Sequence, residues 1–184
     1  SEVLLTIGRR GVVDPFDVTV MRDIIKVPSV RSRELMEGYL WLRASQFQRD
    51  TGQESIAKLE SALSEGPLRG IVLDLRNNPG GVLGASVDMA GAFLDGGLVV
   101  YTEGRHPQSK DRFEATPGDM LNEVPIVVLI NGGSASASEI VAGALQDRRR
   151  AVIMGTRSFG KGSVQTILPV TNTRAVKLTT ALYY

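Results

Sequence analysis

A repeated order of apolar run, glycine-containing turn and helical segment constrains the fold of this chain more than any other feature. Apolar runs at residues 70–75 and 125–130 lead through Asn and Gly residues into segments with helical spacing at residues 82–94 and 136–147. Short buried strands that alternate with helices of about 12 residues are typical of α/β domains. We therefore expect an α/β fold with a largely parallel central sheet.

Other segments of the chain predict additional elements around this repeat. The segment 53–65 predicts a further helix, which Gly66 and Pro67 end. The polar residues 103–123 are predicted to form an exposed loop. Near the start of the chain, apolar residues alternate with other residues in two short stretches, which predicts a β-hairpin. An isolated hairpin is only marginally stable. The predicted strands of the hairpin are residues 3–7 and 16–20, and further strands are predicted at residues 38–47, 98–101, 151–154, 164–169 and 175–183.

Composition excludes several classes of function. The chain has 184 residues, of which 42% are hydrophobic, and this is enough for one main domain. Its formal net charge of +1 provides no field to attract nucleic acid, so no nucleic-acid partner is predicted. The chain has no Cys and a single His, which excludes a cysteine nucleophile and a multi-histidine metal site. His106 lies among charged residues in the polar loop, where we expect it to be solvated.

A serine-rich motif joins the apolar run at 125–130 to the following helix. Residues 131–139 read NGGSASASE, and the Asn-Gly-Gly part tolerates positive φ angles and allows a sharp turn. A serine at this position lies at the positive end of a helix dipole, beside backbone N–H groups able to hold an oxyanion. Ser136 and Glu139 also have the spacing of a capping box. The motif alone therefore does not decide whether Ser136 is a helix cap or a nucleophile.

A lysine lies in a second glycine-rich segment, where residues 155–165 read GTRSFGKGSVQ. The segment departs from a phosphate-binding P-loop, because Gly162 follows Lys161 and the next residues are β-like. A solvated lysine in a turn is the ordinary interpretation. The alternative is that Phe159 and the glycines hold the amine partly out of water, which lowers a lysine pKa and makes it a base for a serine. Gln165 would then orient the amine.

A third glycine turn occurs at residues 73–81, which read LDLRNNPGG. Its glycines would let backbone N–H groups approach a ligand oxygen, although a plain turn between strand and helix fits equally. Asp74 lies within the strand, so we expect it to make structural hydrogen bonds.

Taken together, the motifs resemble those of the carboxyl-terminal processing peptidases, also called tail-specific proteases. The resemblance covers residues 24–30, 73–81, 131–139 and 159–165, in the same order as in that family. It implies a crotonase-like or Clp-protease-like α/β core, with a PDZ domain inserted upstream. Residues 1–23 are then expected to be the trailing strands of an incomplete PDZ domain. Residues 24–184 are expected to be the peptidase core, cut short at its C-terminal end.

The resemblance also implies the site and the reaction, which is that of a Ser/Lys dyad serine endopeptidase. The implied catalytic residues are Ser136 as nucleophile, Lys161 as general base and Gln165 beside it. The implied oxyanion donors are the backbone N–H groups of Gly81 and Ala137, with Gly80 as the alternative to Gly81.

Partners and location follow from the same resemblance. The implied substrates are polypeptides with nonpolar carboxyl-terminal tails, and an activating adaptor protein or a homo-oligomer is open as a further partner. A bacterial protein that is periplasmic or otherwise exported is expected. No cofactor or metal is implied. The main alternative is a non-catalytic ligand-binding module on the same scaffold, and a weaker one is a crotonase-type acyl-CoA enzyme.

Overall fold

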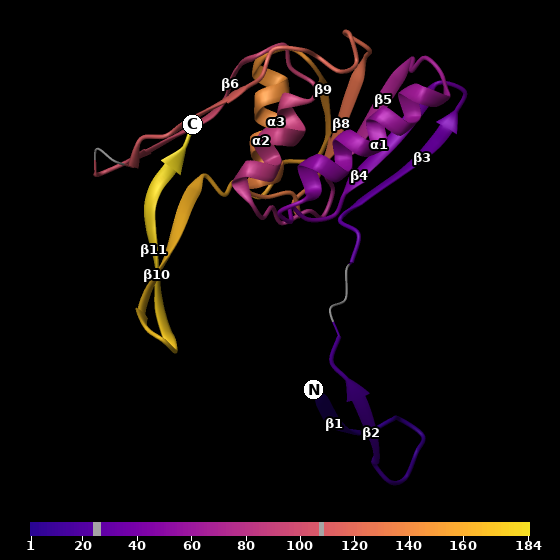
Figure 1. Cartoon of the computed structure of the whole chain (residues 1–184), viewed down its shortest axis with the longest axis vertical. Helices are drawn as coiled ribbons and strands as arrows, with labels where there is room; N and C mark the ends of the chain where they lie inside the picture. The colour runs from indigo at the N-terminus through magenta and orange to yellow at the C-terminus, as the bar shows by residue number, and fades with distance from the viewer. Residues whose placement is uncertain (24–26, 107–108) are drawn as a thin grey trace.

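The computed structural model describes residues 1–23, 27–106 and 109–184 of the chain. Within them, three helices and three sheets build a mixed α/β fold (Figure 1). The helices are α1 (Thr51–Glu65), α2 (Leu83–Gly91) and α3 (Ala137–Asp147). The strands are β1 (Glu2–Ile7), β2 (Phe16–Met21), β3 (Val30–Met36), β4 (Tyr39–Ala44), β5 (Gly70–Asp74), β6 (Gly97–Gly104), β7 (Arg112–Ala115), β8 (Ile126–Ile130), β9 (Val152–Gly155), β10 (Ser163–Thr171) and β11 (Arg174–Tyr183).

The central sheet has the strand order β3-β4-β5-β8-β9. Strands β4, β5, β8 and β9 are parallel, and only the pairing of β3 with β4 in this sheet is antiparallel. The inner strands β5 and β8 are short and apolar, and they bury Leu73 and Val128 on one face while Val72 and Val127 on the other face are half-buried. The predicted α/β class with a largely parallel central sheet is confirmed.

The three helices form a layer against the central sheet. α1 contacts β3 and β4, α3 contacts β9, and α2 lies between α1 and α3 (Figure 1). Each helix directs an apolar stripe into one common core. On α1 this stripe includes the buried Leu59, with Ile56 and Leu63 packed against the core as the spacing predicts.

A second sheet, in the order β10-β11-β6-β7, lies on the other side of α2 and α3. Its strands pair antiparallel. The predicted loop at residues 103–123 is therefore partly wrong, because β6 continues to Gly104 and β7 follows at Arg112. Here Phe113 packs against the core and pairing with β6 supplies the backbone hydrogen bonds, which polar composition does not reveal.

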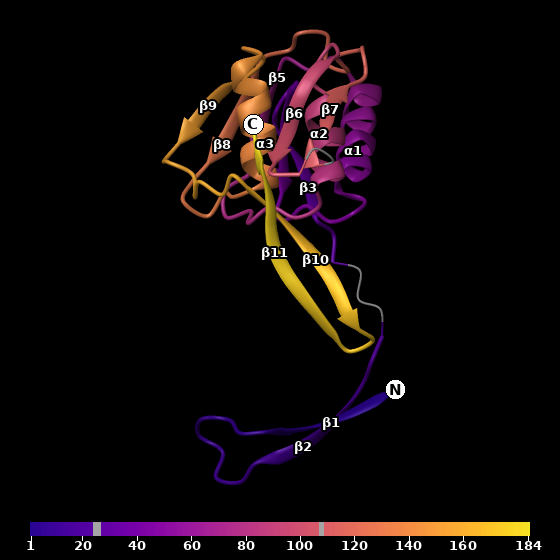
Figure 2. The same cartoon turned by 90° about the vertical axis from the view of Figure 1, so that its left-hand side faces the viewer.

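Two hairpins extend from this body (Figure 2). β1 and β2 form the hairpin predicted near the start of the chain, and they pair with no other described strand. β10 and β11 form a long ribbon whose far end projects from the second sheet. The family-like stretch at 24–30 and the predicted boundary at residue 24 involve residues 24–26, which lie outside the described residues. None of the described helices is long and apolar enough to cross a membrane.

Candidate active site

Ser136 lies at the start of α3, in the turn that follows β8. We call residues 131–136 the serine turn. Ser136 has a φ of 56° and a ψ of −115°, a left-handed conformation that is uncommon for residues other than Gly. Such a conformation persists only where the surroundings determine it. Two hydrogen bonds of Ser134 stabilise the turn. Ser134 Oγ accepts the Asn131 N–H at 3.0 Å within the turn, and it donates to the carbonyl of Leu75, just after β5, at 2.8 Å.

A second turn, which follows β5, lies directly against the serine turn. We call residues 77–81 the glycine turn. Asn131 Nδ2 donates to Asn77 Oδ1 at 3.0 Å, and the Asn77 N–H donates to Asn131 Oδ1 at 2.9 Å. The Ala135 N–H donates to the Asn78 carbonyl at 3.0 Å. Because β5 and β8 are neighbouring parallel strands, the turns at their carboxyl ends meet at one edge of the sheet.

Glycine is required where the two turns touch. A Cβ on Gly80 would lie 2.6 Å from the Ala135 carbonyl oxygen and 2.8 Å from Ser136 Cβ. The φ of Gly80 is 96°, which an L side chain rarely adopts. The close approach brings the glycine turn to the side of the serine.

The backbone donors around Ser136 differ in availability. The Gly80 N–H donates to Asn78 Oδ1 at 2.9 Å, so it is already engaged. The N–H groups of Gly81 and Ala137 donate no hydrogen bond to any described residue. Ala137 is the first residue of α3, where a backbone N–H has no acceptor within the helix. These two groups are able to bind an oxygen from outside the chain.

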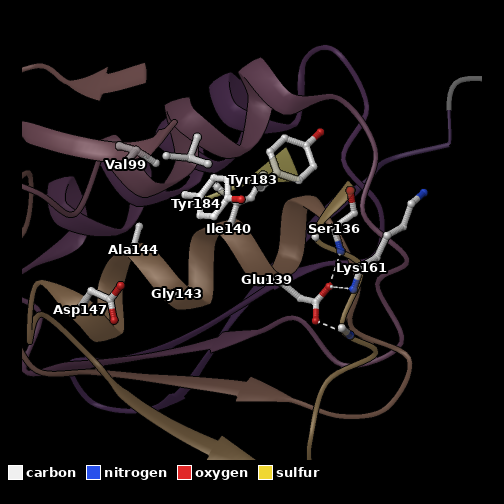
Figure 3. Close-up of a pocket in the computed structure, with 13 residues that line it drawn as sticks. Val99, Ser136, Glu139, Ile140, Gly143, Ala144, Asp147, Lys161, Tyr183 and Tyr184 are labelled. Carbon is white, nitrogen blue, oxygen red and sulfur yellow. Dashed lines mark hydrogen bonds between the residues drawn. The ribbon is translucent and has the colours of Figure 1, made fainter. Parts of the chain in front are cut away.

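Lys161 lies in the irregular stretch between β9 and β10, which we call the lysine segment (residues 156–162). One carboxylate joins this segment to the serine turn (Figure 3). Glu139 Oε1 accepts the Ser158 hydroxyl at 2.7 Å and the Gly160 N–H at 2.6 Å. Glu139 Oε2 accepts the N–H groups of Ser136 at 2.7 Å and Lys161 at 2.8 Å.

These hydrogen bonds keep the Glu139 carboxylate ionised. Burial alone would raise the pKa of Glu139, but the hydrogen bonds from Ser158 and from three backbone N–H groups hold it below its usual range. Glu139 therefore forms the capping box that the sequence indicates, and in addition it binds the lysine segment. Its contact with a segment some 20 residues further along the chain had no sequence signal.

The Lys161 side chain extends away from α3 in Figure 3. No hydrogen bond joins Lys161 Nζ to Ser136 Oγ in the described part of the chain. The Phe159 side chain is 69% exposed, so it does not shield the lysine as its place in the sequence suggested. Lysine has a long flexible stem, and catalytic contacts are often unmade in a substrate-free site, so rotation of this side chain is needed to reach Ser136.

Ser136 and Lys161 line the same cavity, which has a volume of about 380 Å³ (Figure 3). The cavity runs along one side of α3, between that helix and strands β6 and β11. Its apolar wall comes from Val99, Val100, Ile140, Ala144, Tyr183 and Tyr184. Burial raises the pKa of the Tyr183 hydroxyl, and Tyr184 stacks on Tyr101 with ring centroids 5.1 Å apart.

Two other residues considered in the sequence lie away from this cavity. Gln165 is on β10, with its side chain exposed, and it is not part of the cavity lining. His106 is exposed, as expected, and lines a different cavity between the end of β6 and β11. Its neighbours Pro107 and Gln108 lie outside the described residues.

Asp74 has the structural role expected from its place in β5. Its carboxylate is buried and accepts hydrogen bonds from Arg76, Arg43 and Trp41. Burial alone would raise the pKa of Asp74, but the hydrogen bonds and charge of Arg76, with the charge of Arg43, lower it. Across residues 1–23, 27–106 and 109–184, no group of three or more His, Asp or Glu side chains is arranged to hold a metal ion.

Comparison with known proteins gives relatives over the whole chain. It is 53% identical over 188 residues to a carboxy-terminal-processing protease of Bartonella bacilliformis, covering 100% of this chain and 43% of that protein. It is 36% identical over 187 residues to a carboxyl-terminal-processing protease of Synechocystis sp., with the same coverage of each. The chain thus spans less than half the length of these curated relatives.

A solved structure supports the fold assignment. The photosystem II D1 C-terminal processing protease superposes with a TM-score of 0.74 and 30% sequence identity, over 100% of this chain and 51% of that chain. The model of peptidase family S41 matches residues 38–184, which include the glycine turn, the serine turn and the lysine segment. The chain therefore belongs to peptidase family S41.

Proposed function

We propose that this chain carries the catalytic centre of a carboxyl-terminal-processing serine endopeptidase, with Ser136 as nucleophile and Lys161 as general base. One observation carries the proposal: Ser136 is held in a strained turn at a helix N-terminus, on the wall of a cavity that Lys161 also lines. Membership of family S41 and the carboxyl-terminal-processing relatives support it. A binding module has no need of a lysine on the same cavity as a strained serine.

In the proposed reaction the Lys161 side chain rotates toward Ser136 and its neutral amine accepts the hydroxyl proton. Ser136 Oγ bonds to the carbonyl carbon of the scissile peptide, and the carbonyl oxygen becomes an oxyanion. The N–H groups of Gly81 and Ala137 bind that oxyanion. Gly81 is preferred to Gly80 because the Gly80 N–H is engaged by Asn78.

The tetrahedral intermediate then collapses. The C–N bond breaks, and the leaving amine takes the proton from Lys161, which leaves an ester on Ser136. Water then attacks the ester carbonyl as Lys161 accepts one of its protons. The C–O bond to Ser136 breaks, and Lys161 returns the proton to the serine oxygen. We assign Gln165 to orienting the amine during these transfers, by a hydrogen bond that forms when both side chains turn inward.

The cavity supports substrates with apolar side chains near the scissile bond. Its wall includes Val100, Ile140 and Tyr183, and binding of an apolar side chain against this wall is favourable because it removes apolar surface from water. This agrees with polypeptides that have nonpolar carboxyl-terminal tails. Recognition of the tail itself is assigned to a PDZ domain of which residues 1–23 are the trailing strands, followed by a peptidase core from residue 24.

Three finer points belong to the same proposal. The core is of the crotonase-like or Clp-protease-like type, for which the layered α/β architecture is the supporting observation. The protein is exported, in bacteria to the periplasm. An adaptor protein or a homo-oligomer activates it, in keeping with a Lys161 side chain that points away from Ser136 in the isolated chain.

The test uses protein expressed from its complete reading frame and an unstructured polypeptide with a nonpolar carboxyl terminus. We expect Ser136→Ala to lower kcat/KM by about 10³-fold or more and Lys161→Ala by about 10²- to 10⁴-fold, because they remove the nucleophile and the base. His106→Ala is the control and should leave the rate unchanged.

Each alternative outcome has a definite meaning. Variants of Ser136 and Lys161 that cleave as fast as wild type would place the chemistry elsewhere. Loss of activity in a folded His106→Ala protein would overturn the dyad. Tight binding of the polypeptide without cleavage, with or without candidate activators, would favour the non-catalytic binding module.

A further inference from the structure

The lysine segment has few attachments to the serine turn. It contains no helix or strand, and its one backbone bond to that turn is from the Phe159 N–H to the Ser134 carbonyl, at 2.9 Å. Among the described residues, Ser158 is the one residue of the segment whose side chain makes a hydrogen bond, to Glu139 at 2.7 Å, and Phe159 is mostly exposed. Side-chain packing therefore does little to fix where Lys161 leaves the backbone.

Glu139 supplies most of the remaining attachment. Three of its four hydrogen bonds come from the lysine segment, namely from the Ser158 hydroxyl and the Gly160 and Lys161 N–H groups. The fourth comes from the N–H of Ser136 itself, at 2.7 Å. Hydrogen bonds to an ionised carboxylate are shorter and stronger than neutral ones. A single side chain therefore spans the backbone of the nucleophile and the backbone of the base.

This arrangement has a consequence for proton transfer. A general base must come within hydrogen-bond reach of the hydroxyl that it deprotonates. Misplacement by about 1 Å is enough to lower a rate by about 10²-fold. The reach of the Lys161 amine is measured from its own backbone, and Glu139 accepts hydrogen bonds from that backbone and from the backbone of Ser136.

We propose that Glu139 is a positioning residue, which fixes the lysine segment against the serine turn so that the Lys161 amine can reach Ser136. The inference rests on the proposed function, because it presupposes the Ser136 and Lys161 pair. It assigns Glu139 no contact with substrate. Its effect passes through the placement of Lys161.

The first test is Glu139→Gln in protein expressed from its complete reading frame. Glutamine has the same shape but one acceptor oxygen, so two of the four donors would face an NH₂ group instead. We expect kcat to fall by about 10- to 100-fold with KM changed by less than about twofold. Ser158→Ala removes one bond and leaves the carboxylate, so a smaller fall in kcat is expected. An unchanged kcat in Glu139→Gln would overturn the proposal.

The second test separates positioning from a general loss of structure. The rate at which a fluorophosphonate phosphonylates Ser136, with release of fluoride, is measured in wild type, Glu139→Gln, Lys161→Ala and the double variant. If Glu139 acts through Lys161, Glu139→Gln slows phosphonylation much less when the lysine is already absent. An equal reduction of the rate with and without the lysine would refute the positioning role. Glu54→Gln, a change of the same kind in the first turn of α1, is the matched control and should leave the phosphonylation rate unchanged.

Different results overturn the two proposals. If wild type and Lys161→Ala react equally fast with the fluorophosphonate and cleave equally well, the proposed function is wrong and there is no base to position. If Lys161→Ala is inactive but Glu139→Gln is fully active, the dyad stands and the positioning role of Glu139 is wrong. Melting temperatures of all variants identify any that are unfolded.

Discussion

The left-handed backbone of Ser136 depends on the glycine beside it. Ser136 is held by contacts on both sides, and Gly80 is the residue of the glycine turn that approaches its Cβ. Any side chain at residue 80 must displace either the serine or the glycine turn. The strained backbone of Ser136 therefore requires a residue without a side chain at position 80.

A substitution at Gly80 should therefore damage activity more than stability. We expect Gly80→Ala to lower kcat/KM by about 10²-fold through displacement of Ser136, and to lower the free energy of unfolding by about 1–3 kcal/mol through the strained φ. Gly84→Ala is the control, since a Cβ there meets nothing within 4 Å in the first turn of α2. Steady-state kinetics and urea unfolding measure the two effects. Full activity in Gly80→Ala would show that the contact is not needed.

At the level of single residues, the sequence predicted the turns but not the links between them. The serine and glycine motifs were visible because Gly and Asn mark turns that require positive φ. The hydrogen bonds that Asn131 donates to Asn77 and that the Lys161 N–H donates to Glu139 join residues more than 20 positions apart. Such pairs depend on strand order, which a local pattern does not contain.

Strand β5 ends in a buried carboxylate, Asp74, which forms ion pairs with two partly exposed arginines just before the glycine turn. Asp74 is held by Arg76 and Arg43, with oxygen to nitrogen distances of 2.7 and 3.2 Å. Because the pKa of Asp74 is lowered in the folded chain, ionised Asp74 stabilises the fold above its ordinary pKa of 3.8. That stabilisation is lost as the pH falls below this value.

Asp74→Asn tests this contribution. We expect the free energy of unfolding at pH 7 to fall by about 1–3 kcal/mol, because the arginines and Trp41 lose a charged acceptor. The difference between variant and wild type should shrink at pH 3, which lies below the ordinary pKa of 3.8, because Asp74 in the unfolded wild-type chain is then largely protonated and part of the stabilisation is lost. Urea unfolding at both pH values measures it, and Glu103→Gln, in an exposed ion pair, is the control with no measurable change. A difference that persists at pH 3 would rule out the charge as the cause.

The elements that the sequence did not predict are those with little apolar periodicity. β3 exposes most of its residues at the edge of the central sheet, and its pairing with β4 holds it in place. β7 has four residues and one partner strand. The buried strands β5 and β8 and the three helices carried strong apolar patterns, so they were found nearly at their observed positions.

On the scale of the whole molecule, the first hairpin is separate from the rest. β1 and β2 pair only with each other among the described strands, and several of their apolar side chains are exposed, including Leu4, Val20 and Met21. The core cluster contains no residue from this hairpin. The stability of the body should therefore not depend on it.

Deletion of residues 1–23 from this chain should leave the melting temperature within about 2 °C of the intact chain. Leu59→Ala, which removes a fully buried side chain from α1, should cost about 2–5 kcal/mol in the same assay. Differential scanning calorimetry compares the three proteins. A large loss on deletion would mean that the hairpin packs on the body in solution.

The serine turn and the glycine turn are neighbours only because β5 and β8 pair in parallel, with more than 50 residues of chain between them. The lysine segment joins them only after β9 has paired with β8. The proposed centre thus has no partial form carried by one local stretch of sequence. If the proposed function is right, a chain still emerging from the ribosome carries the glycine turn and the serine turn without an assembled centre, so it cannot cleave itself or its neighbours before the sheet is complete.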